Sequence, residues 1–146
     1  MGPILCAADD TEGARAAIRV TRELAEKLGA RVVLVNVEPS PSVPGVSSAL
    51  AGHARLRTEE IDDGQKLLSW LAAEEGLEDA ELRVVIGSAA DRIVGVARET
   101  EASMVVIGSR GRGDLTSAVL GSVSARVAST APCPVVVVPP GASTRA

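Results

Sequence analysis

The segment of this chain with the clearest chemical signature is Gly108–Ser124, GSRGRGDLTSAVLGSVS, near the C-terminal end. Glycines near its start would allow positive φ angles and would leave backbone N–H groups open to an anion. The arginine and serine side chains of the same segment are donors suited to phosphate oxygens. These candidate phosphate ligands are Gly108, Arg110, Gly111, Arg112, Gly113, Ser122 and Ser124.

The same segment also has a simpler interpretation. A surface turn with solvated arginines, followed by a helix of small residues packed on a sheet, would give the same pattern. Gly121 would lie inside that helix, where glycine costs about 1 kcal/mol relative to alanine, so we expect something to pack against its backbone. The segment lacks the Gly-Lys-Ser ending of a P-loop, and it does not follow the first predicted strand as a dinucleotide fingerprint does. The residues alone leave phosphate binding and a surface turn both open.

A pair of carboxylates, Asp9-Asp10, follows the first apolar run and is a second candidate site. Response-regulator receiver domains hold magnesium with paired acids at this place. A receiver also needs a phosphoaccepting aspartate after its third strand, where this chain has Gly-Ser at 87–88, and a late lysine, whereas the last lysine here is Lys66. Capping of the following helix by Asp10 or Thr11 is the simpler role.

The remaining reactive side chains do not form a catalytic set. His53 is the single histidine, and no carboxylate or serine partner stands near it in the sequence, which favours a solvent-exposed side chain. Cys6 and Cys133 lie in or beside apolar segments and lack metal-ligand spacing. We expect both cysteines to be reduced and free of a disulfide.

Apolar runs of strand length recur through the chain, rich in β-branched residues. Each is almost continuously hydrophobic instead of alternating, which is typical of parallel strands covered on both faces. The runs are PILCAA from Pro3, RVVLVNV from Arg31, LRVVIG from Leu82, MVVIG from Met104 and PVVVV from Pro134.

Helical periodicity fills the intervals between these runs. The first helix has Thr11 or Asp10 as its cap and Gly29 as its stop, and the second runs from about Arg57 to Glu75 before Gly76. A third covers 90–100, and a fourth follows Leu115 and ends before Pro132. Expected inward positions are Ala14, Ala17, Ile18, Thr21, Leu24, Ala25 and Leu28 in the first helix, Ile61, Leu68 and Leu71 in the second, Ile93, Val94 and Ala97 in the third, and Val119, Leu120, Val123 and Val127 in the fourth.

The alternation of strands and helices predicts one α/β domain over residues 1–146: an open, doubly wound, five-stranded parallel sheet with four helices. Ligands of such sheets sit beyond the carboxyl ends of the strands, where the strand order reverses. The segment 38–56 is rich in Pro, Ser and Gly and longer than a usual connection, which indicates a flexible surface loop or lid.

The composition argues against some classes of binding partner and indicates where in the cell the protein is found. A net charge of −4 and a pI near 5.0 argue against general binding to DNA, RNA or anionic membranes. No apolar run approaches the roughly 18 residues of a membrane span, and the N-terminus does not resemble a signal peptide. We expect a cytoplasmic protein.

One motif resembles a known family. Gly108-x-x-Gly111, nine further residues, then Gly121-Ser122 is similar to the ATP-binding signature of universal stress proteins. The opening ILCAADD resembles the first βα unit of that family, LGARVVLVNVEP the second strand, VVIGSAADRIVGVARE the third βα unit, and GSVSARVASTAPCPVVVVP the last helix and strand. The likeness covers nearly the whole chain apart from residues around 40–56.

The resemblance implies a site for ATP, placed position by position. Ala7 and Asp9 would lie at the adenosine end, with Val37 against the base. The residues assigned to the ribose and phosphates are Gly108, Ser109, Arg110, Gly111, Arg112, Gly121, Ser122, Val123 and Ser124. The chain departs from the family where Asp-Gly-Ser is often found, having Asp9-Asp10-Thr11, and it has Ala7 where a proline is common.

The function implied is that of a stress-response regulator controlled by ATP, with Mg²⁺ arriving on the nucleotide, and not that of an enzyme. The alternative is a nucleotide-free dimeric interaction module of the same fold. An ATP-consuming hydrolase of the related group would need a Ser-Gly-Gly-x-Asp-Ser loop after the first strand, and that loop is absent. The run from Pro134 would leave an apolar sheet edge exposed, and the resemblance implies a homodimer that covers it.

Overall fold

The five strands found among the described residues run parallel in a single sheet. The computed structural model describes residues 1–39, 50–109 and 120–142. The strands are β1 (Ile4–Ala7), β2 (Val32–Glu38), β3 (Glu81–Ile86), β4 (Met104–Gly108) and β5 (Val135–Val138). The helices are α1 (Glu12–Leu28), α2 (Leu50–Glu74), α3 (Ala89–Glu99) and α4 (Ser122–Thr130), so the predicted alternation is confirmed.

The strand order of the sheet is β3-β2-β1-β4-β5. The chain lays β2 and β3 on one side of β1, then crosses to the other side for β4 and β5. Ile4 of β1 therefore pairs with Val32 on one side and with Met104 on the other. The order reverses between β1 and β4, and their carboxyl ends are where a ligand site is expected.

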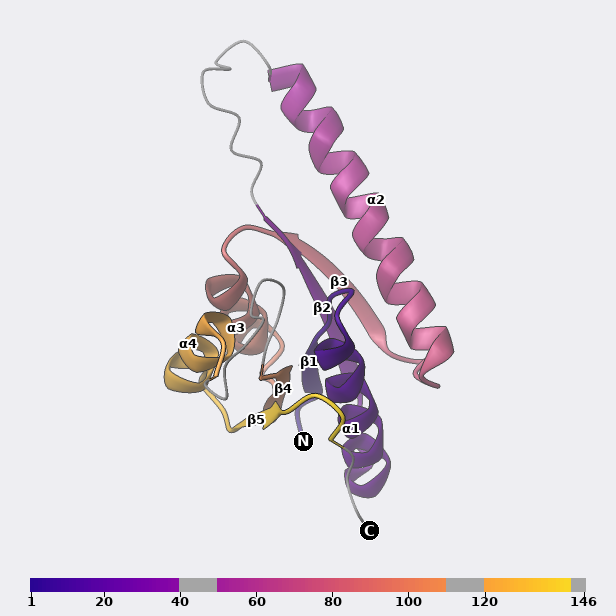
Figure 1. Ribbon diagram of the computed structural model, residues 1–146, viewed down its shortest axis with the longest axis vertical. Coiled ribbons are helices and arrows are strands. Elements are labelled where there is room, and N and C mark those ends of the chain that lie inside the picture. The colour runs from indigo at the N-terminus through magenta and orange to yellow at the C-terminus, as the bar shows by residue number, and fades with distance from the viewer. Residues whose placement is uncertain (40–49, 110–119, 143–146) are drawn as a thin grey trace.

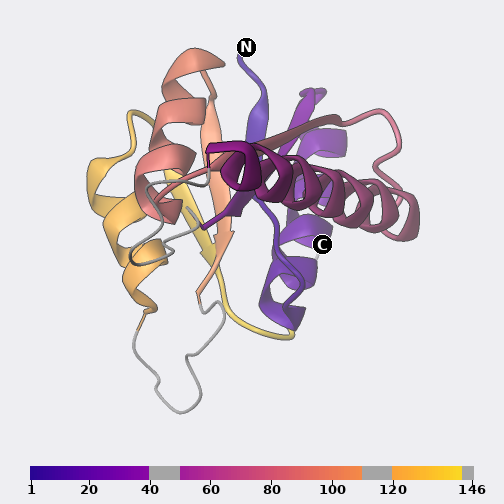
Figure 2. The same cartoon turned by 90° about the horizontal axis from the view of Figure 1, so that it is seen from above.

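Helices cover both faces of the sheet, with α1 and α2 on one face and α3 and α4 on the other (Figures 1 and 2). Successive side chains of a strand point alternately to the two faces of the sheet, so each strand contributes to both core layers. Leu34 belongs to the core under α1 and α2, whereas Val33 and Val35 belong to the core under α3 and α4. This arrangement explains why the strands read as continuously apolar.

Both ends of α1 form as the sequence predicts. The Thr11 hydroxyl is the N-cap and accepts from the backbone N–H of Ala14, and Gly29 takes the left-handed conformation (φ 65°) as its N–H bonds to the carbonyl of Ala25. Most of the expected inward positions are buried or packed against the core. Leu28 is the exception, because it lies in the last turn and is 46% exposed.

Helix α2 begins earlier than expected, at Leu50 and not near Arg57, so the segment 50–56 is helical and not part of a loop. Leu, Ala and Arg in this segment are strong helix formers. Residues 40–49 of the predicted lid lie outside the described residues. Leu68 and Leu71 are buried as predicted, but Ile61 is 38% exposed.

A charged contact joins the end of α2 to α1. Glu75 is 8% exposed, and its carboxylate accepts from Arg15 Nη2 at 3.1 Å and from Arg19 Nε at 3.2 Å. Its backbone carbonyl accepts from Arg22 Nη1 at 3.1 Å. The Arg15 guanidinium also stacks 4.9 Å from the ring centroid of Trp70, which is half-exposed on α2. The two helices are therefore fixed to each other by side chains as well as by the core.

The predicted fourth helix was wrong in its start and in part of its inward face. α4 begins at Ser122, and Gly121 is its N-cap in extended conformation (φ −63°, ψ 159°) and not a glycine in the helix interior. Val127 is buried as predicted, but Leu120 precedes the helix and is 45% exposed, and Val123 is 37% exposed. Glycine favours termination over continuation of a helix, which explains the later start. Val119 lies outside the described residues.

Candidate functional site

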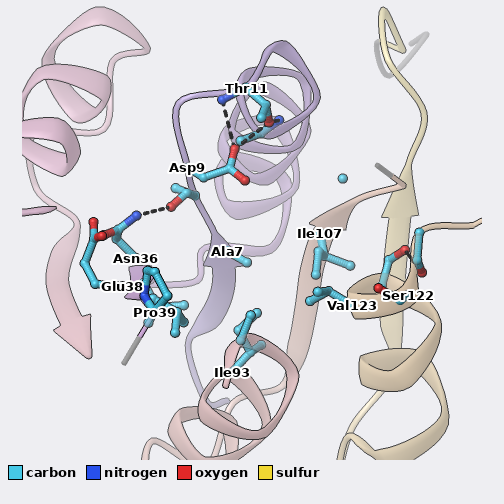
Figure 3. A pocket seen from close by; sticks show the side chains of 18 residues that line it. Ala7, Asp9, Thr11, Asn36, Glu38, Pro39, Ile93, Ile107, Ser122 and Val123 are labelled. Atoms are coloured by element: carbon cyan, nitrogen blue, oxygen red, sulfur yellow. Dashed lines mark hydrogen bonds between the residues drawn. The ribbon is translucent and has the colours of Figure 1, made fainter. Parts of the chain in front are cut away.

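A cavity of about 590 Å³ opens at the carboxyl ends of β1, β2 and β4, where the strand order reverses. The ends of β1 and β2 and the start of α1 form one wall, and α3, the end of β4 and the start of α4 form the other (Figure 3). The cavity brings together most of the predicted site residues: Ala7, Asp9, Val37, Gly108, Gly121, Ser122, Val123 and Ser124. Arg110, Gly111 and Arg112 lie outside the described residues, so their predicted roles remain predictions.

Asp9 is tied to the start of α1. Its Oδ1 accepts from the backbone N–H of Thr11 at 2.9 Å and also from the Thr11 hydroxyl. The Thr11 hydroxyl oxygen in turn accepts from the backbone N–H of Ala14 at 3.2 Å. Thr11, and not Asp10, is therefore the cap, and the chain of bonds fixes the Asp9 carboxylate at the edge of the cavity (Figure 3).

Asn36 lines the cavity and was not identified from the sequence. The side chain is 3% exposed, and its Nδ2 donates to the carbonyl of Ala8 at 3.0 Å. Its Oδ1 is buried and has no hydrogen-bond partner among the described residues. A single polar residue inside the apolar run RVVLVNV was the signal that could have marked it.

Branched apolar side chains form another part of the cavity. Val37 lies near the end of β2 and packs against the core under α3 and α4. Ile93 of α3 and Ile107 of β4 face the same cavity (Figure 3). Ile93 and Ile107 are 3% and 6% exposed, so they present a fixed apolar surface. A flat aromatic base could pack on such a surface without aromatic partners from the protein.

Gly108 is needed for close packing and not for a positive φ angle, which corrects the expectation from the sequence. A Cβ at this position would lie 2.9 Å from the backbone oxygen of Gly13 in α1. The end of β4 can therefore approach the first turn of α1 only because residue 108 has no side chain. This contact places the end of β4 beside the Asp9 turn.

A backbone hydrogen bond between Ser109 and Gly121 joins the end of β4 to the start of α4. The Gly121 N–H donates to the Ser109 carbonyl at 2.7 Å, and the Ser109 N–H donates to the carbonyl of Val138 at 2.8 Å. Ser124 is 3% exposed, and its hydroxyl lies 3.1 Å from the Ser109 carbonyl and 3.0 Å from the Gly121 carbonyl. Its proton is therefore directed to the backbone, so Ser124 holds the start of α4 in place and its hydroxyl is not a free ligand donor.

The start of α4 faces the cavity. Gly121, Ser122 and Val123 line it, and the first N–H groups of a helix have no carbonyl partner within that helix. Gly121 provides no side-chain cap, so within the part of the chain that the structure describes these donors are open to a ligand. Together with the partial positive charge of the helix N-terminus, they suit a phosphate or another anion.

Metal-binding groups do not gather in the part of the chain that the structure describes: no set of three His, Cys, Asp or Glu side chains there could hold a metal ion. The two free cysteines are not involved in the cavity. Burial raises the pKa of Cys6 to about 12, which keeps its thiol protonated and unreactive. None of the described helices is long and apolar enough to cross a membrane.

Comparison with known proteins places this chain in a family. The family model of universal stress proteins matches residues 1–139 of the chain. The chain belongs to the universal stress protein family. A universal stress protein of Thermus aquaticus is 32% identical over 136 residues, which cover 92% of this chain and 96% of the relative.

Solved structures of universal stress proteins share the fold. One from Archaeoglobus fulgidus superimposes with a TM-score of 0.70 at 27% identity, covering 94% of this chain and 98% of that chain. A second from the same organism, solved in complex with dAMP, gives a TM-score of 0.64 at 26% identity over 94% of this chain and 98% of that chain. The five-stranded parallel architecture is therefore shared with a universal stress protein that binds an adenine nucleotide.

Proposed function

We propose that the cavity binds an adenine nucleotide, with ATP as the expected ligand. We also propose that the protein is a cytoplasmic regulator of a stress response. The observation that carries the proposal is the joining, in one cavity, of an apolar wall with the uncapped start of α4 at the reversal of strand order. A volume of about 590 Å³ is within the range of small-molecule sites. The dAMP complex of the A. fulgidus relative supports the nucleotide class.

The nucleotide would lie across the cavity from β2 to α4. Val37 and Ile93 would contact the base, and Asp9 would accept hydrogen bonds from the ribose hydroxyls. The phosphate oxygens would accept hydrogen bonds from the N–H groups at the start of α4 and from the Ser122 hydroxyl. The family resemblance assigns residues 110–112 to the phosphates. In the sequence they lie between Ser109 and Gly121, whose backbones are hydrogen-bonded to each other.

We propose that the nucleotide is a regulatory ligand and is hydrolysed slowly. The ionisable side chains that line the described cavity are Asp9 and Glu38, which lie on the β1 and β2 side, across the cavity from Ser122 (Figure 3). A general base for attack on the terminal phosphate would have to act close to the start of α4. Mg²⁺ would be held mainly by the phosphates of the nucleotide itself.

The test is to denature the purified protein, identify any released nucleotide by chromatography, and titrate the stripped protein with ATP, AMP and GTP by calorimetry. We expect adenine nucleotides to bind and GTP to bind more weakly. If the folded protein neither carries nor rebinds any nucleotide, the proposal is wrong, and the nucleotide-free interaction module becomes the better hypothesis.

We also propose that the protein forms a homodimer through β5. This strand lies at the edge of the sheet, and its valines at 135, 136 and 137 are only partly buried. An exposed apolar edge strand offers unpaired backbone groups to another strand, and proteins usually cover such edges. Sedimentation velocity at micromolar concentration should show a dimer, and a stable monomer would argue against β5 as an interface.

A further inference from the structure

Asn36 follows two apolar residues on one face of β2. Val32 and Leu34 point to the same layer of the core and are apolar, and both are buried. Asn36 continues this face and is equally buried at 3% exposure. A buried amide carries a desolvation penalty that a leucine would avoid, so the position calls for a role that only a polar side chain performs.

The two ends of the Asn36 amide face different elements. Nδ2 donates to the carbonyl of Ala8, at the end of β1. Oδ1 faces α2, because a Cβ on Gly64 would lie 2.8 Å from it. The opposite orientation of the amide would place Oδ1 against the Ala8 carbonyl oxygen, where two acceptors repel. The amide therefore has one fixed orientation, in which Nδ2 is bonded to β1 and Oδ1 faces α2 without a hydrogen-bond partner among the described residues.

The bond to Ala8 extends the pairing of β1 with β2 to the residue before Asp9. The Ala8 N–H already donates to the Val35 carbonyl at 2.8 Å, so the Asn36 side chain satisfies the other backbone group of Ala8. The chain then leaves the sheet at Asp9, whose carboxylate accepts from Thr11. Asn36 is therefore bonded to the last residue before the Asp9 turn.

We infer that Asn36 is a positioning residue for the adenosine end of the cavity, and that Gly64 of α2 leaves the space its amide requires. The inference rests on the proposed nucleotide site and adds a link from that site to α2. Gly64 does not line the cavity. Any effect of a Gly64 substitution on nucleotide binding is therefore indirect, and the atoms nearest to an added Cβ belong to Val84 and Asn36.

The test separates the two ends of the ligand. Asn36→Ala should lower the affinity for AMP roughly five- to tenfold, the loss expected for one displaced hydrogen bond. It should leave the affinity for inorganic tripolyphosphate unchanged, because that probe occupies only the start of α4. A general loss of structure would weaken both ligands together. Equal affinity of the variant and the wild type for AMP would overturn the inference.

Gly64→Ala tests the link to α2. We expect it to weaken AMP binding in the wild-type background and to weaken it less in the Asn36→Ala background, where the contact with Val84 remains but the contact with the amide is gone. Additive losses in the double variant would contradict transmission through Asn36. Gly95→Ala is the matched control, since a Cβ on that helical glycine meets nothing within 4 Å, and it should leave AMP binding unchanged.

Amide hydrogen exchange keeps the inference testable if the wild type binds no nucleotide, a result that would refute the proposed function separately. The Thr11 N–H is bonded to Asp9, so its exchange reports the order of the turn. Asn36→Ala should raise the exchange rate of Thr11 at least fivefold while amides in the middle of α3 stay unchanged. An unchanged Thr11 rate would show that Asn36 does not position the turn.

Discussion

Gly108→Ala should destabilise the protein through a single added methyl group. The new Cβ would lie 2.9 Å from the Gly13 backbone oxygen and 3.1 Å from its carbonyl carbon. Both are main-chain atoms of the first turn of α1, so the contact cannot be relieved by rotating a side chain. Overpacking of this kind costs about 1–3 kcal/mol. For a domain of this size, each kcal/mol corresponds to roughly 2–4 °C in Tm.

The assay is urea denaturation followed by circular dichroism, with wild-type protein and Gly95→Ala measured in parallel. Gly95 lies inside α3, and an added Cβ there meets nothing within 4 Å. That control should gain up to about 1 kcal/mol because alanine is the better helix former. If Gly108→Ala were as stable as wild type, the close approach of β4 to α1 would not depend on the missing side chain, and the reasoning would fail.

Three further predictions concern other parts of the molecule. Glu75→Ala should lower the free energy of unfolding by roughly 1–3 kcal/mol in urea denaturation, because the Arg15 guanidinium loses its charged acceptor; an unchanged midpoint would show that the pair contributes nothing. Because burial raises the pKa of Cys6 to about 12 from 9.0, stability should fall as the pH rises from 9 to 12, and Cys6→Ala should flatten that dependence. Gly121→Val should abolish ATP binding in calorimetry with the circular dichroism spectrum unchanged, since valine can adopt φ −63° and ψ 159° but would occupy space that the phosphates need; unaltered affinity would place the phosphates elsewhere.

The sequence was sufficient to predict the sheet and α1, because the signals for both are local. Continuous β-branched runs indicate strands buried on both faces, and Thr11 and Gly29 mark the helix ends by their own conformational preferences. The cavity residues Asp9 and Val37 were assigned by the family resemblance, and the predicted strands agree with that assignment. Once the strands are known, Asp9 and Val37 must lie at their carboxyl ends, and the structure places both in one cavity.

The failures concern residues whose role depends on contacts distant in the sequence. Gly121 was expected inside a helix, because the small residues on both sides fit helical periodicity, and only its bond to Ser109 shows that α4 starts there. Gly108 was expected to need a positive φ, whereas its contact with Gly13 explains the glycine. Asn36 was missed, since a single polar residue near a strand end does not indicate by itself which carbonyl it will bind.

Trp70 makes this protein unusually simple to follow by fluorescence. It is the single aromatic side chain in a chain without Phe or Tyr, and it stacks on Arg15 at the contact between α1 and α2. Its emission therefore reports one defined place, the packing of α2 on α1, without background from other fluorophores. A change in emission on addition of nucleotide would show that α2 responds to the cavity, with no label attached to the protein.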